Sequence, residues 1–270
     1  MIVQDFHNHT TFCDGKADPE AMVQAAIERG ITRLGLLIHS YTFFDESYCA
    51  AKDAPAKFQK AIAELKEKYR GQIELYCGVE QDYYSAETTA GFDYVIGSVH
   101  YLYGDGEYPT VDDCRESAMA TANRFFGGDW YAYCEEYFRV VADLVEKTKP
   151  NIIGHFDLIT KFDEKEKNRY LQNTDYWSLA EKYCLQALKS GGIFEVNTGL
   201  VARGYRSSFS PHERLLRLIY KNGGKITFSS DSHEIKTLQG CFDEVRAMVK
   251  EIGFQYIYIF QKGEWAKKII

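Results

Sequence analysis

Six of the seven histidines follow short apolar segments, and three of them belong to closely spaced pairs of potential metal ligands. The pairs are His7 with His9 and Asp231 with His233, each separated by a single residue. Alternate residues of an extended strand point to the same side, so each pair can direct both side chains to one point. Neutral imidazoles and carboxylates are ligands that borderline divalent metals accept. One such pair arises easily by chance, whereas two pairs at opposite ends of the chain indicate a metal site.

Single residues of similar type stand after the intervening apolar segments. They are His39, Glu80, His100, His155 and Asn197. Any one of these histidines, taken alone, could be a core residue bonded to the backbone, but the whole set predicts a polynuclear metal centre. The remaining histidine, His212, follows a Ser-Pro pair at the start of a predicted helix, and we interpret it as an exposed capping residue.

The elements that must position these residues are short strands alternating with longer amphipathic helices. Strands are expected at residues 2–6, 33–38, 72–77, 94–96, 151–153, 193–196 and 226–228. Helices are expected at residues 18–30, 54–69, 112–126, 131–147, 174–189, 211–221 and 238–252. This alternation predicts a parallel sheet with right-handed crossovers, either an open doubly wound sheet or a barrel. A barrel gathers the carboxyl ends of all its strands on one rim, so the ligand positions favour the barrel.

The composition describes one globular domain spanning residues 1–270. Apolar residues make up 45% of the chain and charged residues 26%, and no linker or low-complexity stretch divides it. The net charge of −7 argues against binding to nucleic acid or to an anionic membrane surface. We expect no membrane span and no N-terminal leader. The seven cysteines form no CxxC pair and favour reduced thiols in a cytoplasmic protein. The sequence carries no signal for an oligomeric state.

The same residues resemble the PHP (polymerase and histidinol phosphatase) family. The matching segments are DFHNHT at 5–10, CDG at 13–15, HS at 39–40, GVE at 78–80, GSVH at 97–100, GHFD at 154–157, EVN at 195–197 and SDSH at 230–233. Segments 41–49, 80–83 and 154–160 are similar to the stand-alone histidinol-phosphate phosphatases of that family. One departure is Ile38, because many family members have Asp directly before the histidine at this point.

The resemblance implies a single-domain distorted (β/α)7 barrel of the PHP type with three divalent transition-metal ions, either Zn, Fe or Mn. By position, one ion would be held by His7, His9, Glu80 and Asp231. A second would be held by Asp14, His39 and His233, and a third by His100 and His155 with Glu80 bridging.

The resemblance also implies hydrolysis of L-histidinol phosphate to L-histidinol and phosphate, a step of histidine biosynthesis. In such a centre a hydroxide generated between two metals attacks phosphorus, with Glu80 bridging the ions and Asp231 or Asp14 available to protonate the leaving group. No P-loop, CxxxxxR or DxDxT signature is present, which argues against a covalent phospho-enzyme.

Two other functions are open at this point. The first is a PHP phosphoesterase acting on nucleotide 5′-phosphates or short oligonucleotides, which the acidic charge and the lack of a Lys/Arg cluster disfavour. The second is a non-catalytic PHP module, which the nearly complete set of ligand positions disfavours.

A phosphomonoester also needs cationic groups for its outer oxygens. Arg203 is the preferred residue because a guanidinium can bind phosphate through two parallel hydrogen bonds, and Arg206 could exchange roles with it. Lys161 is a second candidate, and a solvated surface charge is the alternative interpretation of this residue. Tyr101 follows a ligand position and is expected to line the substrate pocket. Asp45 and Glu46 could face a substrate ammonium or imidazole, and a solvated loop charge is the alternative interpretation of either one alone.

Overall fold

Seven parallel strands form one sheet within the residues described by the computed structural model, which are 4–166, 169–261 and 263–270. Their order in the sheet follows their order in the chain. The strands are β1 (Gln4–Asp5), β2 (Arg33–His39), β3 (Glu74–Asp82), β4 (Tyr94–Ser98), β5 (Ile152–Ile153), β6 (Ile193–Asn197) and β7 (Lys225–Ser229). Residues 2 and 3 of the expected first strand lie outside the described residues.

The first and last strands of the sheet meet just beyond their carboxyl ends. Asn8 pairs with Ser232 in a parallel bridge. The Ser232 amide donates to the His7 carbonyl at 3.0 Å, and the His9 amide donates to the Ser232 carbonyl at 2.8 Å. These bonds close the rim of the sheet, so the prediction of a seven-stranded barrel rather than an open doubly wound sheet is confirmed.

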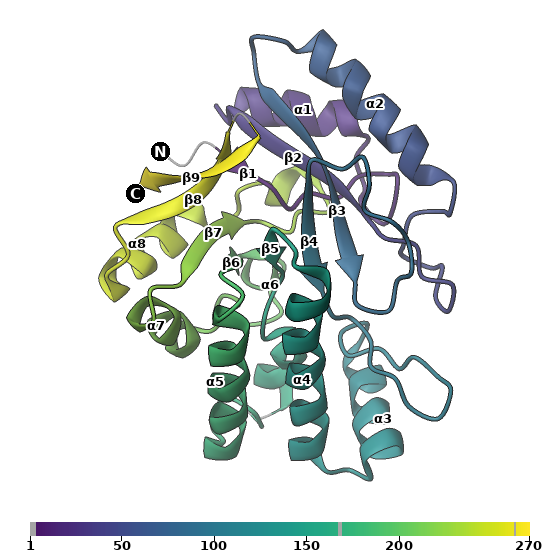
Figure 1. Cartoon of the computed structure of the whole chain (residues 1–270), viewed down its shortest axis with the longest axis vertical. Helices are drawn as coiled ribbons and strands as arrows, with labels where there is room; N and C mark the ends of the chain where they lie inside the picture. The colour runs from purple at the N-terminus through teal and green to yellow at the C-terminus, as the bar shows by residue number, and fades with distance from the viewer. Residues whose placement is uncertain (1–3, 167–168, 262) are drawn as a thin grey trace.

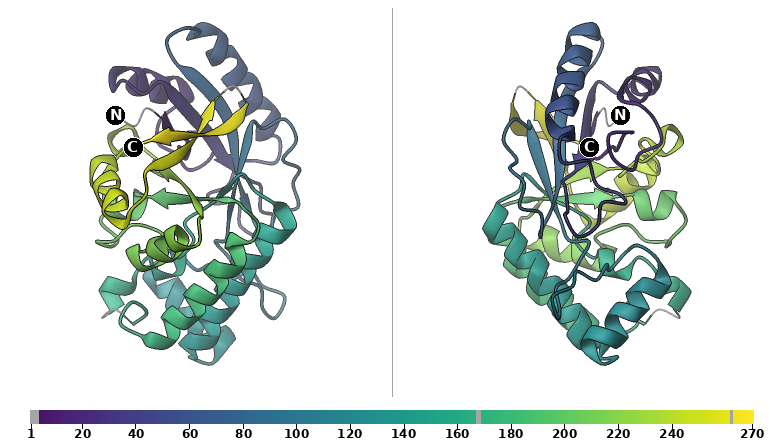
Figure 2. Two further views of the ribbon diagram at one scale, coloured as in Figure 1. Left: turned by 60° about the vertical axis from the view of Figure 1, so that its left-hand side comes forward. Right: turned by 90° about the vertical axis from the view of Figure 1, so that its right-hand side faces the viewer.

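The helices are arranged around the strands, and most of them pack on the outside of the barrel, as Figures 1 and 2 show. They are α1 (Pro19–Glu28), α2 (Ala54–Lys68), α3 (Arg115–Phe126), α4 (Trp130–Thr148), α5 (Thr174–Leu188), α6 (Gly199–Ala202), α7 (Glu213–Lys221) and α8 (Phe242–Ile252). Short 3-10 turns occupy η1 (Leu158–Thr160), η2 (Asp163–Glu166) and η3 (Ile235–Thr237). The helix expected from residue 112 begins instead at Arg115, because the Cys114 sulfur accepts from the Ser117 amide and caps it there.

Local sequence explains the start of α1 and the tight packing inside the barrel. The Asp18 carboxylate accepts from the Ala21 amide at 3.0 Å, and a proline follows at the first helical position.

Within the barrel, a Cβ atom on Gly35 would lie only 2.3 Å from the Tyr94 side chain, and one on Gly78 only 2.2 Å from it. These two glycines therefore leave room for a fully buried aromatic ring.

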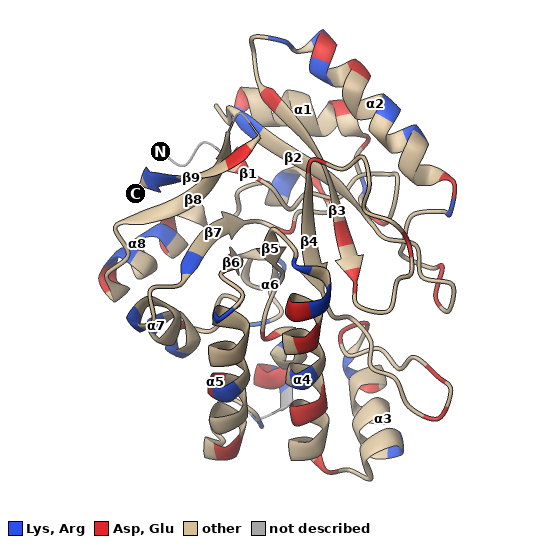
Figure 3. Cartoon of the chain, in the orientation of Figure 1, with Lys and Arg blue, Asp and Glu red and all other residues tan. Residues whose placement is uncertain are grey.

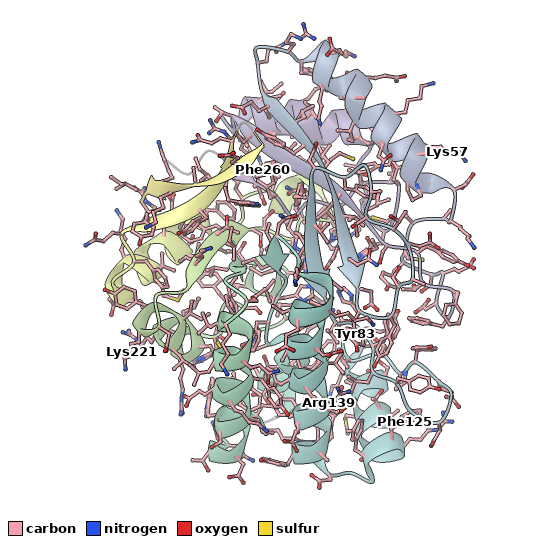
Figure 4. The ribbon with its side chains drawn as sticks, viewed as in Figure 1. Lys57, Tyr83, Phe125, Arg139, Lys221 and Phe260 are labelled. Carbon is pink, nitrogen blue, oxygen red and sulfur yellow. The ribbon has the colours of Figure 1, made fainter. Side chains whose placement is uncertain are left out.

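A C-terminal hairpin, which the sequence pattern did not predict, packs across the start of the barrel. It consists of β8 (Tyr256–Gln261) and β9 (Glu264–Ile269). Phe260, labelled in Figure 4, lies 5.9 Å from the Phe6 ring, and its amide donates to the Gln4 side chain at 3.1 Å. The contacts tie the end of the chain to β1, at the opposite end of the strands from the histidines.

Charged residues occupy mainly the helices and loops, whereas the strands are largely uncharged in Figure 3. Lys57 on α2 and Lys221 on α7 point away from the barrel in Figure 4. Across the described residues, no helix combines the length and the apolar character that a bilayer crossing requires.

Candidate metal centre

The potential ligands converge at the carboxyl ends of six different strands. His7 and His9 follow β1, His39 ends β2, Glu80 lies in β3, His100 follows β4, His155 follows β5, and Asp231 and His233 follow β7. Most of these side chains are buried, and Glu80 is only 1% exposed. An isolated buried carboxylate is costly, so Glu80 requires compensating positive charge.

One oxygen of Glu80 faces three imidazoles. Its Oε2 atom lies 3.1 Å from His7 Nε2, 3.3 Å from His9 Nε2 and 3.2 Å from His39 Nδ1. Burial raises the pKa of Glu80, but the neighbouring imidazoles, with His7 the strongest, outweigh burial and hold that pKa well below its usual range. This oxygen is therefore the meeting point of ligands from the first three strands.

The other oxygen of Glu80 faces two further imidazoles. Its Oε1 atom lies 3.0 Å from His155 Nε2 and 3.4 Å from His100 Nε2. Glu80 thus stands between two sets of histidines, which is the geometry that a bridging carboxylate requires.

A second group of ligands lies beside the first. Asp14 Oδ2 is 3.0 Å from His233 Nε2, while its Oδ1 atom is 3.6 Å from both His39 Nε2 and His9 Nδ1. Asp14, with a side chain 30% exposed, is the most open member of the group. His9 and His39 border both groups, whereas the family resemblance assigned each of them to a single ion.

Asp231 links the first group to a cation of the protein. Its Oδ1 atom lies 3.6 Å from Nε2 of both His7 and His9, and its Oδ2 atom is 3.0 Å from Arg203 Nη2. Burial raises the pKa of Asp231, but Arg203 and the imidazoles, His7 first among them, hold it well below its usual range. The backbone φ of Asp231 is +48°, a conformation that tends to occur where a side chain must be aimed for function.

The donor set fits divalent metal ions. His9 Nε2 and His100 Nδ1 are buried and have no hydrogen-bond partner among the described residues. Two ligands of one metal, each about 2.1 Å from it, lie roughly 3 to 3.5 Å apart, as the ring nitrogens and Glu80 oxygens do here. Three groups each bring their ligand atoms within 4.8 Å of one another: His7, His9 and Glu80; His39, Glu80 and His100; and His9, Asp14, His39 and His233.

A cavity of about 290 Å³ opens directly onto these ligands. Besides metal-ligand candidates it is lined by Asp45, Ser47, Tyr48, Tyr101, Thr110, Asp112, Asp113, Leu158, Lys161, Arg203 and Tyr205. Its size is at the lower end of the range for small-molecule pockets.

Three of the four residues predicted to bind substrate line this cavity. The Arg203 guanidinium is held by the Asp231 carboxylate and carbonyl, with its side chain 22% exposed. Lys161 Nζ donates to the Asp112 carbonyl at 2.6 Å and to its carboxylate at 3.1 Å. Tyr101 donates its hydroxyl to Asp45 Oδ2 at 2.7 Å. Lys161 is therefore a largely buried pocket residue, not the solvated surface charge that was the alternative.

The structure contradicts the prediction for Arg206. This residue is 3% exposed and does not line the cavity. Its guanidinium pairs with Asp157 at 3.3 Å and also donates to Thr160 and to two backbone carbonyls. Because its hydrogen-bonding capacity is used inside the protein, Arg206 cannot exchange roles with Arg203.

Three residues of the centre were not predicted to be ligands, although Asn197 belonged to the predicted set of strand-end residues. Asp82 Oδ2 accepts from the His100 amide at 3.1 Å, and the Asn197 side-chain amide donates to Asp231 at 3.3 Å. Glu195 contacts the outer nitrogen of His7 at 2.9 Å. Glu195 could have been found from the sequence, because it is an acid inside an otherwise apolar predicted strand. Such an acid indicates a buried charge that has a partner.

Comparison with known protein families identifies a match to the PHP domain. A model of the PHP domain matches residues 5–199, which is most of the chain.

Individual relatives and solved structures agree with this match. A Schizosaccharomyces pombe protein named "Probable histidinol-phosphatase" is 26% identical over 95% of this chain and 89% of its own. The Bacillus subtilis histidinol-phosphatase is 25% identical over 87% of this chain and 94% of its own. The structure of a Lactococcus lactis histidinol phosphate phosphatase in complex with zinc, L-histidinol and phosphate has a TM-score of 0.71 and 20% identity, and covers 98% of both chains. This structural likeness shows that the fold is shared.

Proposed function

Because this chain belongs to the PHP domain family, we propose that it hydrolyses L-histidinol phosphate to L-histidinol and phosphate. The observation that carries the proposal is Glu80, a buried carboxylate surrounded by five imidazoles at the floor of a small cavity. Curated relatives named histidinol-phosphatase align over nearly their whole length, which supports the same substrate here. Residues 1–270 would form one catalytic domain that acts in the cytoplasm. The seven unpaired cysteines suit such a reducing compartment.

The proposed centre holds three divalent ions, with Zn, Fe and Mn all compatible with its mixed ligands. The first ion would be held by His7, His9, Glu80 and Asp231. The second would be held by Asp14, His39 and His233. The third would be held by His100, His155 and Glu80. When bound, neighbouring divalent ions lower the pKa of a shared water and neutralise charge on the phosphoryl oxygens.

The protein itself orients the phosphoryl group. Two N–H groups of Arg203 are anchored on Asp231, which places the guanidinium on the cavity wall beside the ligands. Its other N–H groups would bind outer phosphoryl oxygens. Lys161, anchored on Asp112, would place a second positive charge on the wall of the same cavity.

We predict that the purified protein contains more than one transition-metal ion per chain. Removal of the ions with a strong chelator should abolish hydrolysis, because Arg203 and Lys161 can contact the phosphoryl oxygens but cannot lower the pKa of the attacking water as divalent ions do. Elemental analysis and assays before and after chelation measure both effects, and activity should return on adding Zn²⁺, Mn²⁺ or Fe²⁺. Full activity in a protein shown to be free of metal would contradict the mechanism.

The organic part of the substrate would meet Asp45. This half-buried carboxylate accepts from Tyr101 at 2.7 Å and from Ser47 Oγ at 2.6 Å. Burial raises the pKa of Asp45, but the hydrogen bonds from Ser47 and Tyr101 outweigh burial and hold the pKa below its usual value. The group is therefore ionised at neutral pH. In the part of the chain that the structure describes, no lysine or arginine pairs with it. Its free charge suits the ammonium or imidazole of histidinol phosphate, whereas Glu46 does not line the cavity.

Replacing Asp45 with asparagine should raise KM for histidinol phosphate about tenfold, because a charge-assisted hydrogen bond contributes about 1.5 kcal/mol. KM for a phosphomonoester with an uncharged organic part should stay the same. Glu46→Gln is the matched control, since it removes a neighbouring charge that lies outside the cavity lining. Equal effects of Asp45→Asn on both substrates would remove Asp45 from substrate recognition.

A substrate screen with metal-loaded protein tests the proposed function. We expect kcat/KM for histidinol phosphate to exceed that for every member of a panel of nucleoside 5′-monophosphates and short oligonucleotides. A preference for the nucleotides would establish the alternative phosphoesterase activity. Absence of turnover in protein shown to contain metal would indicate a non-catalytic module.

A further inference from the structure

Glu195 is a fully buried acid of β6 that lies behind the metal ligands. It is 0% exposed, and among the described residues its side chain forms a hydrogen bond with one ligand side chain, at Nδ1 of His7. His7 directs its other ring nitrogen, Nε2, toward Glu80 Oε2 at 3.1 Å. Glu195 therefore lies on the far side of the His7 ring from the proposed ions.

One oxygen of Glu195 is held by two groups that can only donate. Its Oε1 atom accepts from the His155 amide at 2.6 Å and from Asn197 Nδ2 at 2.9 Å. The orientation of the Asn197 side chain is set by the Gly199 amide, which donates to Asn197 Oδ1 at 2.8 Å. Neither donor can reverse its role, so an acceptor is required at this position.

The other oxygen of Glu195 faces His7 and Ser229. Its Oε2 atom lies 2.9 Å from His7 Nδ1 and accepts from the Ser229 hydroxyl at 2.6 Å. Because its two oxygens already accept from the His155 amide, Asn197 and Ser229, Glu195 is stabilised as an ionised carboxylate with no proton to donate, so Nδ1 of His7 must carry the hydrogen. In a neutral imidazole, Nε2 is then the nitrogen with the free lone pair.

We infer that Glu195 is a positioning residue that keeps His7 Nε2 available as a ligand and couples that imidazole to the backbone of His155. The inference rests on the metal centre of the proposed function. A carboxylate behind a metal-binding imidazole commonly fixes the ring and its tautomer in this way. Here the same carboxylate joins ligand segments that follow β1 and β5.

Glutamine at this position should reverse the hydrogen bond to His7. The single carboxamide oxygen must face the His155 amide and Asn197, because both are obligate donors. The carboxamide NH₂ group would then face His7 Nδ1 and Ser229, whose hydroxyl can rotate to accept. His7 could accept this bond only with its proton on Nε2, where the proton blocks metal binding.

We predict that Glu195→Gln weakens the binding of Zn²⁺ by about 10- to 100-fold, the usual effect of changing a partner of a metal ligand. Competition with a chromophoric chelator measures affinity, and elemental analysis measures the ions retained. Ser229→Ala is the matched control, because it removes a hydrogen bond to the same oxygen without reversing the one to His7. Unchanged Zn²⁺ affinity in Glu195→Gln, or an equal loss in Ser229→Ala, would overturn the inference.

A measurement on the wild-type holoprotein covers the case in which Glu195→Gln does not fold. In zinc-loaded protein with ¹⁵N-labelled histidine, the His7 signals, identified by their absence in a His7→Asn variant, should show a proton on Nδ1 and none on Nε2. A proton on Nε2 would overturn the inference. Failure of the wild-type protein to bind zinc would instead reject the metal centre itself, so the two failures are distinguishable.

Discussion

Replacing Glu80 with glutamine is expected to lower kcat/KM for histidinol phosphate by roughly a thousandfold, the equivalent of several kcal/mol of transition-state stabilisation. The side chain keeps its size but loses the charge on which five imidazoles converge. Glutamine offers one acceptor oxygen in place of two, so it can no longer bridge the His7 side and the His155 side of the centre. We therefore expect metal content to fall together with activity.

Metal analysis and steady-state kinetics on the same preparation test this expectation. Glu74→Gln is the matched control, because Glu74 lies on the same strand, β3, but is exposed and far from the ligand atoms. That control should retain both metal and activity. A Glu80→Gln protein with full metal content and near-normal kcat/KM would show that Glu80 does not bridge ions.

Replacing Arg203 with alanine is expected to lower kcat/KM by about 100- to 1,000-fold, the usual cost of losing a preorganised donor to transition-state charge. Two effects act together. The cavity loses the donor best suited to the phosphoryl oxygens, and Asp231 loses the cation that lies 3.0 Å from its carboxylate. Arg203→Lys should recover part of the loss, because lysine restores charge without the forked geometry.

Kinetics and metal content together separate these two effects. With metal content unchanged, a lower kcat/KM assigns Arg203 to substrate binding and catalysis. If metal is lost as well, the main role of Arg203 is to hold Asp231. Arg217→Ala on α7 provides the control, because that exposed arginine pairs with Glu213 at the surface, away from the cavity. Unchanged kinetics in Arg203→Ala would exclude the residue from the site.

The two chemically equivalent arginines show where sequence reasoning reached its limit. Arg203 and Arg206 are three residues apart and follow the same strand. Asp157, nearly fifty residues earlier, decides between them by pairing with Arg206 at 3.3 Å in the protein interior. A partner this distant in sequence leaves no local pattern around either arginine.

The shared ligands are a second example. Residue types and spacing predicted that His9 and His39 belong to a metal centre, but not that each lies between two groups of ligands. This depends on how the barrel brings β1 and β2 beside β3, with His39 opposite Glu80 in the sheet register. The role of Glu195 likewise depends on β6 facing segments from both β1 and β5.

Ligand chemistry and the alternation of strands and helices were determined by the sequence alone, because both are local properties. An imidazole keeps its preference for divalent metals wherever it lies, and hydrophobic periodicity identifies an element from a few neighbouring residues. Tertiary structure alone decided which charges are neutralised inside the protein, which remain in the cavity, and that a C-terminal hairpin packs across the start of the barrel. These outcomes depend on contacts between residues far apart in the chain, and only folding brings such residues together.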